Sequence, residues 1–242
     1  MGIRMEEAEA LLKGIAAKPP GPGTVFACRQ SADKADTHEL YIYDDITKYG
    51  DFNWETWSYE DSETSARHIR EILDGLPEGA ALDIHINSNG GDAYEAVTIY
   101  NLLNQYKGYK TSYVDGVAHS AAFIIPFACD RRIMGKGTAA LFHNMWTRVA
   151  GNAKELRLAA DRLDKLMESN RSIYAERAVG LTEEQIAEMM DNETMLTPED
   201  CLKYGFCDEI SGYVPHDGQQ ASGQGAGALP QARSQESGQQ GP

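Results

Sequence analysis

The sequence predicts an α/β fold built on a parallel sheet. Some segments have apolar residues at every second position, as in a strand, and others have apolar residues with the 3.6-residue period of a helix. The two kinds of segment alternate along the chain. The clearest strand is 81–88, where Leu82, Ile84 and Ile86 alternate with polar residues. Two glycines follow, and a helical pattern begins at Ala93. Strands that are joined by helices pair in parallel through right-handed crossovers.

The other elements follow from the same two periods. Strand patterns occur at 39–46, 110–114, 132–134 and 139–142, and helical patterns at 62–76, 93–106, 121–128, 153–178, 186–190 and 198–205. We expect the strand 110–114 to be broken at Gly116. Thr182 and Gln185 form a capping box, and Thr197 stands before a proline at a first helical position. These signals fix the starts of the last two helices.

The length of 242 residues suits one domain of ordinary size with tails. We predict a partly flexible N-terminal appendage over 1–37, one domain over 38–214, and a disordered tail over 215–242. The tail is rich in Gly, Gln and Ser and almost lacks large apolar side chains. Such a segment cannot bury enough surface to become ordered.

Composition argues against several classes of partner. The net charge of -15 disfavours binding to nucleic acid or to an anionic membrane surface, because both require clustered Lys and Arg. No apolar stretch approaches the roughly 20 residues of a membrane helix. Charges occupy the place where a secretory signal would have its apolar centre. The four cysteines show no C-x-x-C pair, and no His/Cys/Asp cluster in the sequence has the spacing of metal ligands. We therefore predict a cytoplasmic protein without metal or cofactor.

Two glycine-bearing turns between a strand and a helix can carry chemistry. In the first, 86–92, Gly90 and Gly91 allow backbone conformations that a side chain would forbid. The N-terminus of the next helix would direct free N–H groups at this turn, which suits an oxyanion. A nucleotide loop is excluded because its lysine and its spacing are absent. A plain tight turn is the structural alternative.

The second turn, 116–122, carries Ser120 between small residues at the start of an apolar helix. On local features alone a helix cap is the simpler interpretation of this serine. The pattern also differs from the G-x-S-x-G elbow of α/β-hydrolases. Ser120 therefore becomes a candidate nucleophile only in combination with the first turn.

Taken together, the motifs resemble the proteolytic subunit of the Clp protease, the peptidase S14 family. INSNGG, a helix, a strand and GVAHSAA stand where that family has a pattern close to INSPGG and then G-x-A-A-S. Downstream, ALFHN matches the strand before the catalytic histidine, and YGFCD matches a terminal motif. The resemblance spans about 39–210. The stretches ELYIYDDI and ETMLTPED, with Trp54 and Trp57, look more like the phage and prophage branch, which is associated with capsid (prohead) maturation.

The resemblance implies a serine endopeptidase that works through an acyl-enzyme. Ser120 would attack the peptide carbonyl, and His143 would act as its base. The N–H groups of Gly91 and Ala121 would form the oxyanion hole. The family has a methionine where Ala121 stands, but only the backbone is needed there.

The acid that would complete a catalytic triad with Ser120 and His143 is left open. The family supplies an aspartate, whereas the aligned residue here is Glu193, with Asp191 as the alternative and no functional acid as a third reading. His119 is set aside as a base because neighbours in sequence rarely face each other. Trp146 is interpreted mainly as a packing residue.

The implied fold is the Clp/crotonase spiral of β-β-α units with a protruding handle helix. The resemblance further implies a homo-oligomeric ring, a heptamer or two stacked rings, whose hydrolytic core itself uses no ATP. Its partners would be peptide or protein substrates, with an AAA+ unfoldase or phage capsid and scaffold proteins. Two rival functions remain open: a crotonase-like acyl-CoA enzyme and a non-catalytic assembly protein that keeps the fold.

Overall fold

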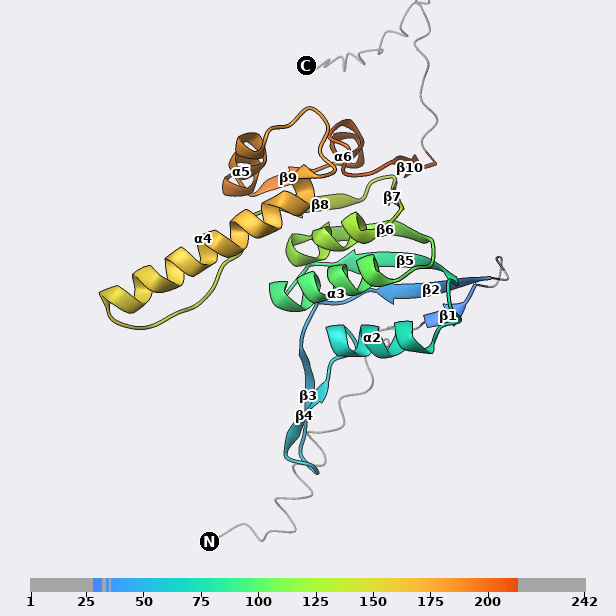
Figure 1. The fold of residues 1–242 in the computed structure, drawn as a ribbon, viewed down its shortest axis with the longest axis horizontal. Helices are drawn as coiled ribbons and strands as arrows, with labels where there is room; N and C mark the ends of the chain where they lie inside the picture. Colours follow the sequence, from blue (N-terminus) through green and yellow to red (C-terminus); the bar gives the residue numbers. More distant parts are fainter. Residues whose placement is uncertain (1–27, 32–33, 35, 213–242) are drawn as a thin grey trace, which may run out of the picture. The chain divides into compact units, whose positions relative to one another are not determined.

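The computed structural model describes residues 28–31, 34 and 36–212 (Figure 1). The tail predicted over 215–242 and most of the appendage predicted over 1–37 lie outside these residues. The described part of the predicted appendage contains strand β1 (Cys28–Gln30), which pairs antiparallel with β2 (Thr37–Ile42). Among the described residues no helix is both long and apolar enough to cross a membrane.

The large sheet confirms the predicted α/β fold. Its main path runs β1, β2, β5 (Ala81–Ser88), β6 (Lys110–His119), β7 (Arg131–Gly135) and β10 (Glu209–Ser211). Every pair along this path from β2 to β10 is parallel. The alternation of 81–88 therefore predicted the central strand with its correct bounds.

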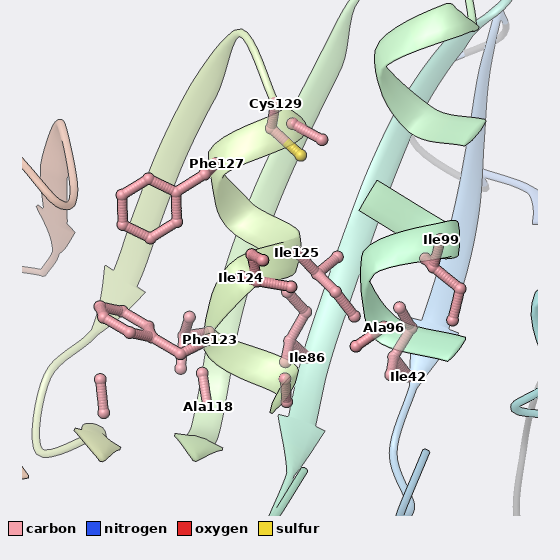
Figure 2. Close-up of a cluster of buried hydrophobic side chains, with 14 of the residues drawn as sticks. Ile42, Ile86, Ala96, Ile99, Ala118, Phe123, Ile124, Ile125, Phe127 and Cys129 are labelled. Carbon is pink, nitrogen blue, oxygen red and sulfur yellow. The ribbon is translucent and has the colours of Figure 1, made fainter. Parts of the chain in front are cut away.

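Three helical segments supply apolar side chains to the core beside the sheet. They are helices α2 (Ala66–Gly75) and α3 (Ala93–Gln105) and the 3₁₀-helix η1 (Ser120–Ala128). Figure 2 shows the cluster in which Ile86 of β5 lies among Ala96 of α3 and Ile125 of η1. These three side chains are almost fully buried. Each isoleucine buried in this way stabilises the fold by roughly 1.5–3 kcal/mol relative to exposure.

The C-terminal half packs around aromatic rings. It contains β8 (Ala139–Phe142), α4 (Ala153–Ala175), α5 (Glu183–Asp191), β9 (Thr194–Leu196) and α6 (Pro198–Lys203). Tyr174 of α4 is buried edge-on against Phe142 of β8, with ring centroids 4.7 Å apart. Both predicted helix starts are observed, with capping boxes at Thr182 and Thr197.

Strand β6 is longer than expected. The predicted break at Gly116 is wrong, because β6 continues to His119. A Cβ at Gly116 would overlap the side-chain oxygen of Asn87, which instead accepts a hydrogen bond from the Val117 N–H at 3.2 Å. The glycine thus accommodates a register shift between β5 and β6 rather than ending the strand.

Two differences concern the segment before α2. Strands β3 (Tyr49–Asn53) and β4 (Ser58–Asp61) form a separate antiparallel hairpin that the sequence did not predict. Helix α2 starts at Ala66 instead of residue 62, because Ser65 is its N-cap. Its side chain accepts a hydrogen bond from the His68 N–H.

Asp208, which directly precedes β10, is bonded to Arg132 of β7 and predicts acid sensitivity. Burial acts to raise the pKa of Asp208, but hydrogen bonds from the Arg132 guanidinium and backbone outweigh it and hold the pKa below its ordinary value. A lowered pKa in the folded state stabilises the protein above the unfolded pKa of about 3.9, and this contribution is lost as pH falls through the folded value.

We therefore expect the free energy of unfolding to drop below about pH 4. Because the Asp208 side chain is 39% exposed, solvent screens its ion pair with Arg132, and Asp208→Asn should cost no more than about 1 kcal/mol at pH 7. Urea unfolding between pH 3 and pH 7 measures both effects. The Asp208→Asn curve should be flatter in acid than the wild-type curve. Parallel curves would show that Asp208 contributes nothing to the pH dependence.

Candidate active site

Ser120 lies at a strained junction between a strand and a helix. Strand β6 ends at His119, and η1 begins at Ser120 with a φ of 54°. This left-handed conformation costs a non-glycine residue roughly 1–2 kcal/mol. Strain of this kind persists only where the surrounding structure enforces it, and it concentrates at functional sites. The first N–H groups of a helix also lack partners within the helix, which leaves donors beside the serine.

The turn after β5 packs directly against Ser120. Gly90 has a φ of 97°, and a Cβ built on it would lie 2.8 Å from the Ser120 Cβ and 3.0 Å from the Ala121 nitrogen. On the other side, Ile46 donates its N–H to the Gly90 carbonyl and accepts from the Asp92 N–H, each at 2.7 Å. The N–H of Gly91, between these two groups, points away from Ile46. The two glycine-bearing turns therefore meet in space.

Strand β8 brings His143 to the same edge of the sheet. It pairs in parallel with β6, so that Leu141 lies opposite His119. His143 follows two residues after Leu141, and Ser120 follows one residue after His119. Because the carboxyl ends of parallel strands meet at one edge, the imidazole and the hydroxyl come from neighbouring strand ends.

These groups line one cavity of about 910 Å³. Its lining includes the predicted Ser120, His143, Gly91 and Ala121. The described hydrogen bonds include none between Ser120 and His143. Catalytic hydrogen bonds are often long or poorly aligned before substrate binds, so a shared cavity is the relevant geometric finding.

His143 holds the tautomer that a base needs. Its Nδ1 lies 2.6 Å from the backbone carbonyl oxygen of Asn144. Because a carbonyl only accepts, Nδ1 carries the hydrogen and Nε2 keeps its lone pair. The Nε2 atom is therefore free to accept a proton.

Neither acid candidate bonds to this imidazole. Asp191 instead accepts a hydrogen bond from the Asn144 side chain at 2.6 Å. Glu193 is exposed at the turn before β9, with a φ of 48°. Strand β9 pairs antiparallel with β8, and Phe142 lies opposite Thr194. Continued by one residue, that register places Glu193 opposite His143.

Two further residues of the cavity lining, His119 and Trp146, bear on the candidate site. His119, set aside in the sequence, lines the cavity, and its Nε2 is buried without a hydrogen-bond partner among the described residues. Burial and, to a smaller extent, the charge of nearby His143 lower the pKa of His119 below its ordinary value. Trp146 is not a packing residue, because it is 69% exposed and lines the cavity beside the Arg148 guanidinium. The GVAHSAA and FHNMW patterns contained both residues, but only the fold shows which way they face.

A family model described as Clp protease matches residues 60–213, more than half of the chain. The chain belongs to the Clp protease family. It is 29% identical over 160 residues to the ATP-dependent Clp protease proteolytic subunit 1 of Corynebacterium efficiens, covering 62% of this chain and 75% of that protein. It is 25% identical over 141 residues to the corresponding subunit of Deinococcus radiodurans, covering 57% of this chain and 69% of that protein.

A solved structure shares the fold of this chain. A mutant of ClpP1 from Listeria monocytogenes superposes with a TM-score of 0.57 at 23% identity, covering 71% of this chain and 90% of that chain. At this identity the comparison concerns the fold. It confirms the Clp-type fold that the sequence motifs implied.

Proposed function

We propose that this chain is a serine endopeptidase of the Clp type, with Ser120 as nucleophile and His143 as general base. The observation that carries the proposal is the shared cavity, which is lined both by a strained serine just after β6 and by an imidazole just after the neighbouring strand β8. Membership in the Clp protease family supports the same reaction.

In the proposed reaction, the Ser120 Oγ attacks the carbonyl carbon of the scissile peptide, and His143 Nε2 takes the hydroxyl proton. The tetrahedral oxyanion is stabilised by the N–H groups of Gly91 and Ala121. The carbon–nitrogen bond then breaks, and the imidazolium returns the proton to the leaving amine. Water, activated by the same imidazole, hydrolyses the acyl-enzyme and restores Ser120.

A fluorophosphonate probe tests this proposal. We expect the probe to label the wild-type chain once, at Ser120, and to leave Ser120→Ala unlabelled, because only an activated serine reacts with it. Mass spectrometry of the labelled peptide identifies the site. Absent labelling together with binding of an acyl-CoA thioester would favour the crotonase-type alternative, and a folded protein with neither property would favour an assembly role.

We propose Glu193 as the acid that orients His143, with its carboxylate replacing the Asn144 carbonyl as the acceptor of the Nδ1–H hydrogen bond. Glu193→Gln should lower kcat/KM by about 100-fold or more, since loss of the acid in a serine triad costs up to about 10⁴. The isosteric Asp191→Asn should cost less than about three-fold, because Asp191 is engaged by the Asn144 side chain. Hydrolysis of a fluorogenic peptide measures both variants. A larger loss in Asp191→Asn would reverse the assignment.

The proposed setting is a homo-oligomeric ring of the phage and prophage branch, acting in the cytoplasm on capsid or scaffold chains. The motifs ELYIYDDI and ETMLTPED support this branch. Because the hydrolytic step needs no nucleotide, short peptides should be cleaved at the same rate with and without ATP. An ATP requirement for such peptides would contradict an independent peptidase core.

A further inference from the structure

The segment that carries His143 takes its position from side-chain contacts. Residues 143–152 connect β8 to α4 and form neither helix nor strand (Figure 1). His143 and Met145, both in this segment, line the cavity. A segment without a ladder of backbone hydrogen bonds is fixed by the individual groups that find partners elsewhere. The place of the imidazole in the cavity therefore depends on a small number of contacts.

Two methionine sulfur atoms tie this segment to α4. The Met145 N–H donates a hydrogen bond to the Met167 Sδ at 3.0 Å, and the Asn170 side chain donates one to the Met145 Sδ at 3.0 Å. Among the hydrogen bonds of the described residues, this N–H is the only backbone donor of 144–149 that has a partner. Met145, Met167 and Asn170 thus form a thioether clip that anchors the segment on α4.

The clip holds the backbone from which the imidazole projects. The peptide group between Asn144 and Met145 is rigid and planar. Its N–H donates to the Met167 Sδ, and its carbonyl oxygen accepts from the His143 Nδ1. A shift of Met145 relative to α4 therefore moves the peptide group beside the imidazole. Misplacement of a reacting group by 1 Å can cost about 100-fold in rate.

Met145 stands where a small oxidant can reach it. Its side chain packs against the core on one side and lines the cavity on the other, whereas Met167 is only 5% exposed. A thioether reacts with a peroxide to give a sulfoxide. The sulfur gives up two electrons and gains an S–O bond, the O–O bond of hydrogen peroxide breaks, and water leaves. No other reactant is needed.

The sulfoxide is incompatible with the clip. The Asn170 nitrogen lies 3.0 Å from the Met145 Sδ, which leaves no room for an oxygen atom between them. The oxidised side chain is also polar, and burying a polar group against an apolar core without a partner is unfavourable. A close-packed interior yields to such a group by displacing it. Oxidation should therefore push Met145 away from α4.

We infer that Met145 is an oxidation site through which peroxide lowers peptidase activity, by opening the thioether clip and displacing His143. Met145 acts here as a positioning residue, because its effect passes through the imidazole. The inference names a regulation of the proposed peptidase and rests on that function. Reduction of the sulfoxide by a methionine sulfoxide reductase reverses the change.

Peroxide treatment of the full chain tests the site. In treated wild type, kcat for a fluorogenic peptide should fall at least about ten-fold while KM stays within about three-fold, because a displaced base impairs the chemical step more than binding. Mass spectrometry should find the added oxygen on Met145, and the reductase should restore kcat. Met145→Leu keeps the volume without the sulfur, so treatment should leave its kcat within about two-fold of its own untreated value.

Met195→Leu is the matched control. Met195 is 56% exposed on β9 and does not line the cavity, so it is oxidised readily without touching the clip. This variant should lose activity under peroxide as wild type does. Met145→Gln places a polar side chain in the clip without any oxidant, and it should lower kcat at least about ten-fold. Circular dichroism shows that each variant is folded.

Modification by diethyl pyrocarbonate reports on His143 without any hydrolysis. Oxidation of wild type should raise the rate at which His143 is modified at least about two-fold relative to His68, because opening of the segment exposes the ring. The rate should not change in Met145→Leu. His68 lies on α2, outside the cavity lining, and serves as the internal standard in the same digest.

Four outcomes would overturn the inference: no oxygen on Met145, a treated Met145→Leu that loses activity as wild type does, a Met195→Leu that is protected, or a Met145→Gln with full activity. The peptidase is judged separately. An untreated wild type that neither hydrolyses peptide nor reacts with fluorophosphonate, but whose His143 still responds to oxidation, contradicts the peptidase alone. An active wild type whose His143 does not respond contradicts the clip alone.

Discussion

Peptide hydrolysis by the His143→Ala variant is expected to fall by roughly 10⁴- to 10⁶-fold in kcat. The serine hydroxyl is almost fully protonated at neutral pH, so it needs a base within reach. His143 has its Nε2 free, since Nδ1 is engaged by the Asn144 carbonyl. A fluorogenic peptide assay, with fluorophosphonate labelling as a second readout, measures the loss.

The matched control is His68→Ala, because His68 lies on α2 away from the cavity lining. Its kcat should stay within about two-fold of wild type, as expected for a surface substitution away from the site. His119 provides the sharper alternative. If His143→Ala keeps near-normal turnover and His119→Ala loses it, the base is the imidazole beside the serine.

Substitution of Gly90 by alanine is expected to damage stability and activity together. The new Cβ would lie 2.6 Å from the His119 carbonyl oxygen and 2.8 Å from the Ser120 Cβ, at a φ of 97° that side chains rarely adopt. We expect a loss of at least about 2 kcal/mol in the free energy of unfolding. Displacement of Ser120 should lower kcat/KM by about 100-fold, since misplacement by 1 Å can cost that much.

Gly79→Ala separates the two causes. Gly79 also has a positive φ, 74°, but a Cβ there would meet nothing within 4 Å. It should lose about 1 kcal/mol of stability through backbone strain and keep full activity. Urea unfolding and the peptide assay compare the variants. Equal behaviour of the two alanine variants would mean that the contact of Gly90 with Ser120 has no consequence.

The elements that the sequence predicted are those with a local signal. The alternation of 81–88 gave β5 because every second side chain is buried, and capping residues located α5 and α6 because their hydrogen bonds are local. Strands β9 and β10 span three residues each and form only by pairing with distant strands. No local pattern can reveal such short strands.

The sequence did not predict the β3–β4 hairpin because its segment lacks a strand pattern. Residues 49–61 are rich in strand-forming aromatics, but Trp54 and Trp57 face solvent, so the segment lacks the alternation of a half-buried strand. The cavity was predicted in part. The positions of Ser120 and His143 follow from the order of motifs, whereas the exposure of Trp146 and the burial of the His119 Nε2 atom depend on packing.

Strand β8 links the core to the candidate site through its alternation. Ala140 and Phe142 are buried, while Leu141 and, beyond the strand, His143 line the cavity on the other side. A slip of β8 by one residue would exchange these two faces. On the proposed assignment, a nascent or misfolded copy has no hydrolytic power, because its imidazole reaches the alcohol only after the sheet has closed.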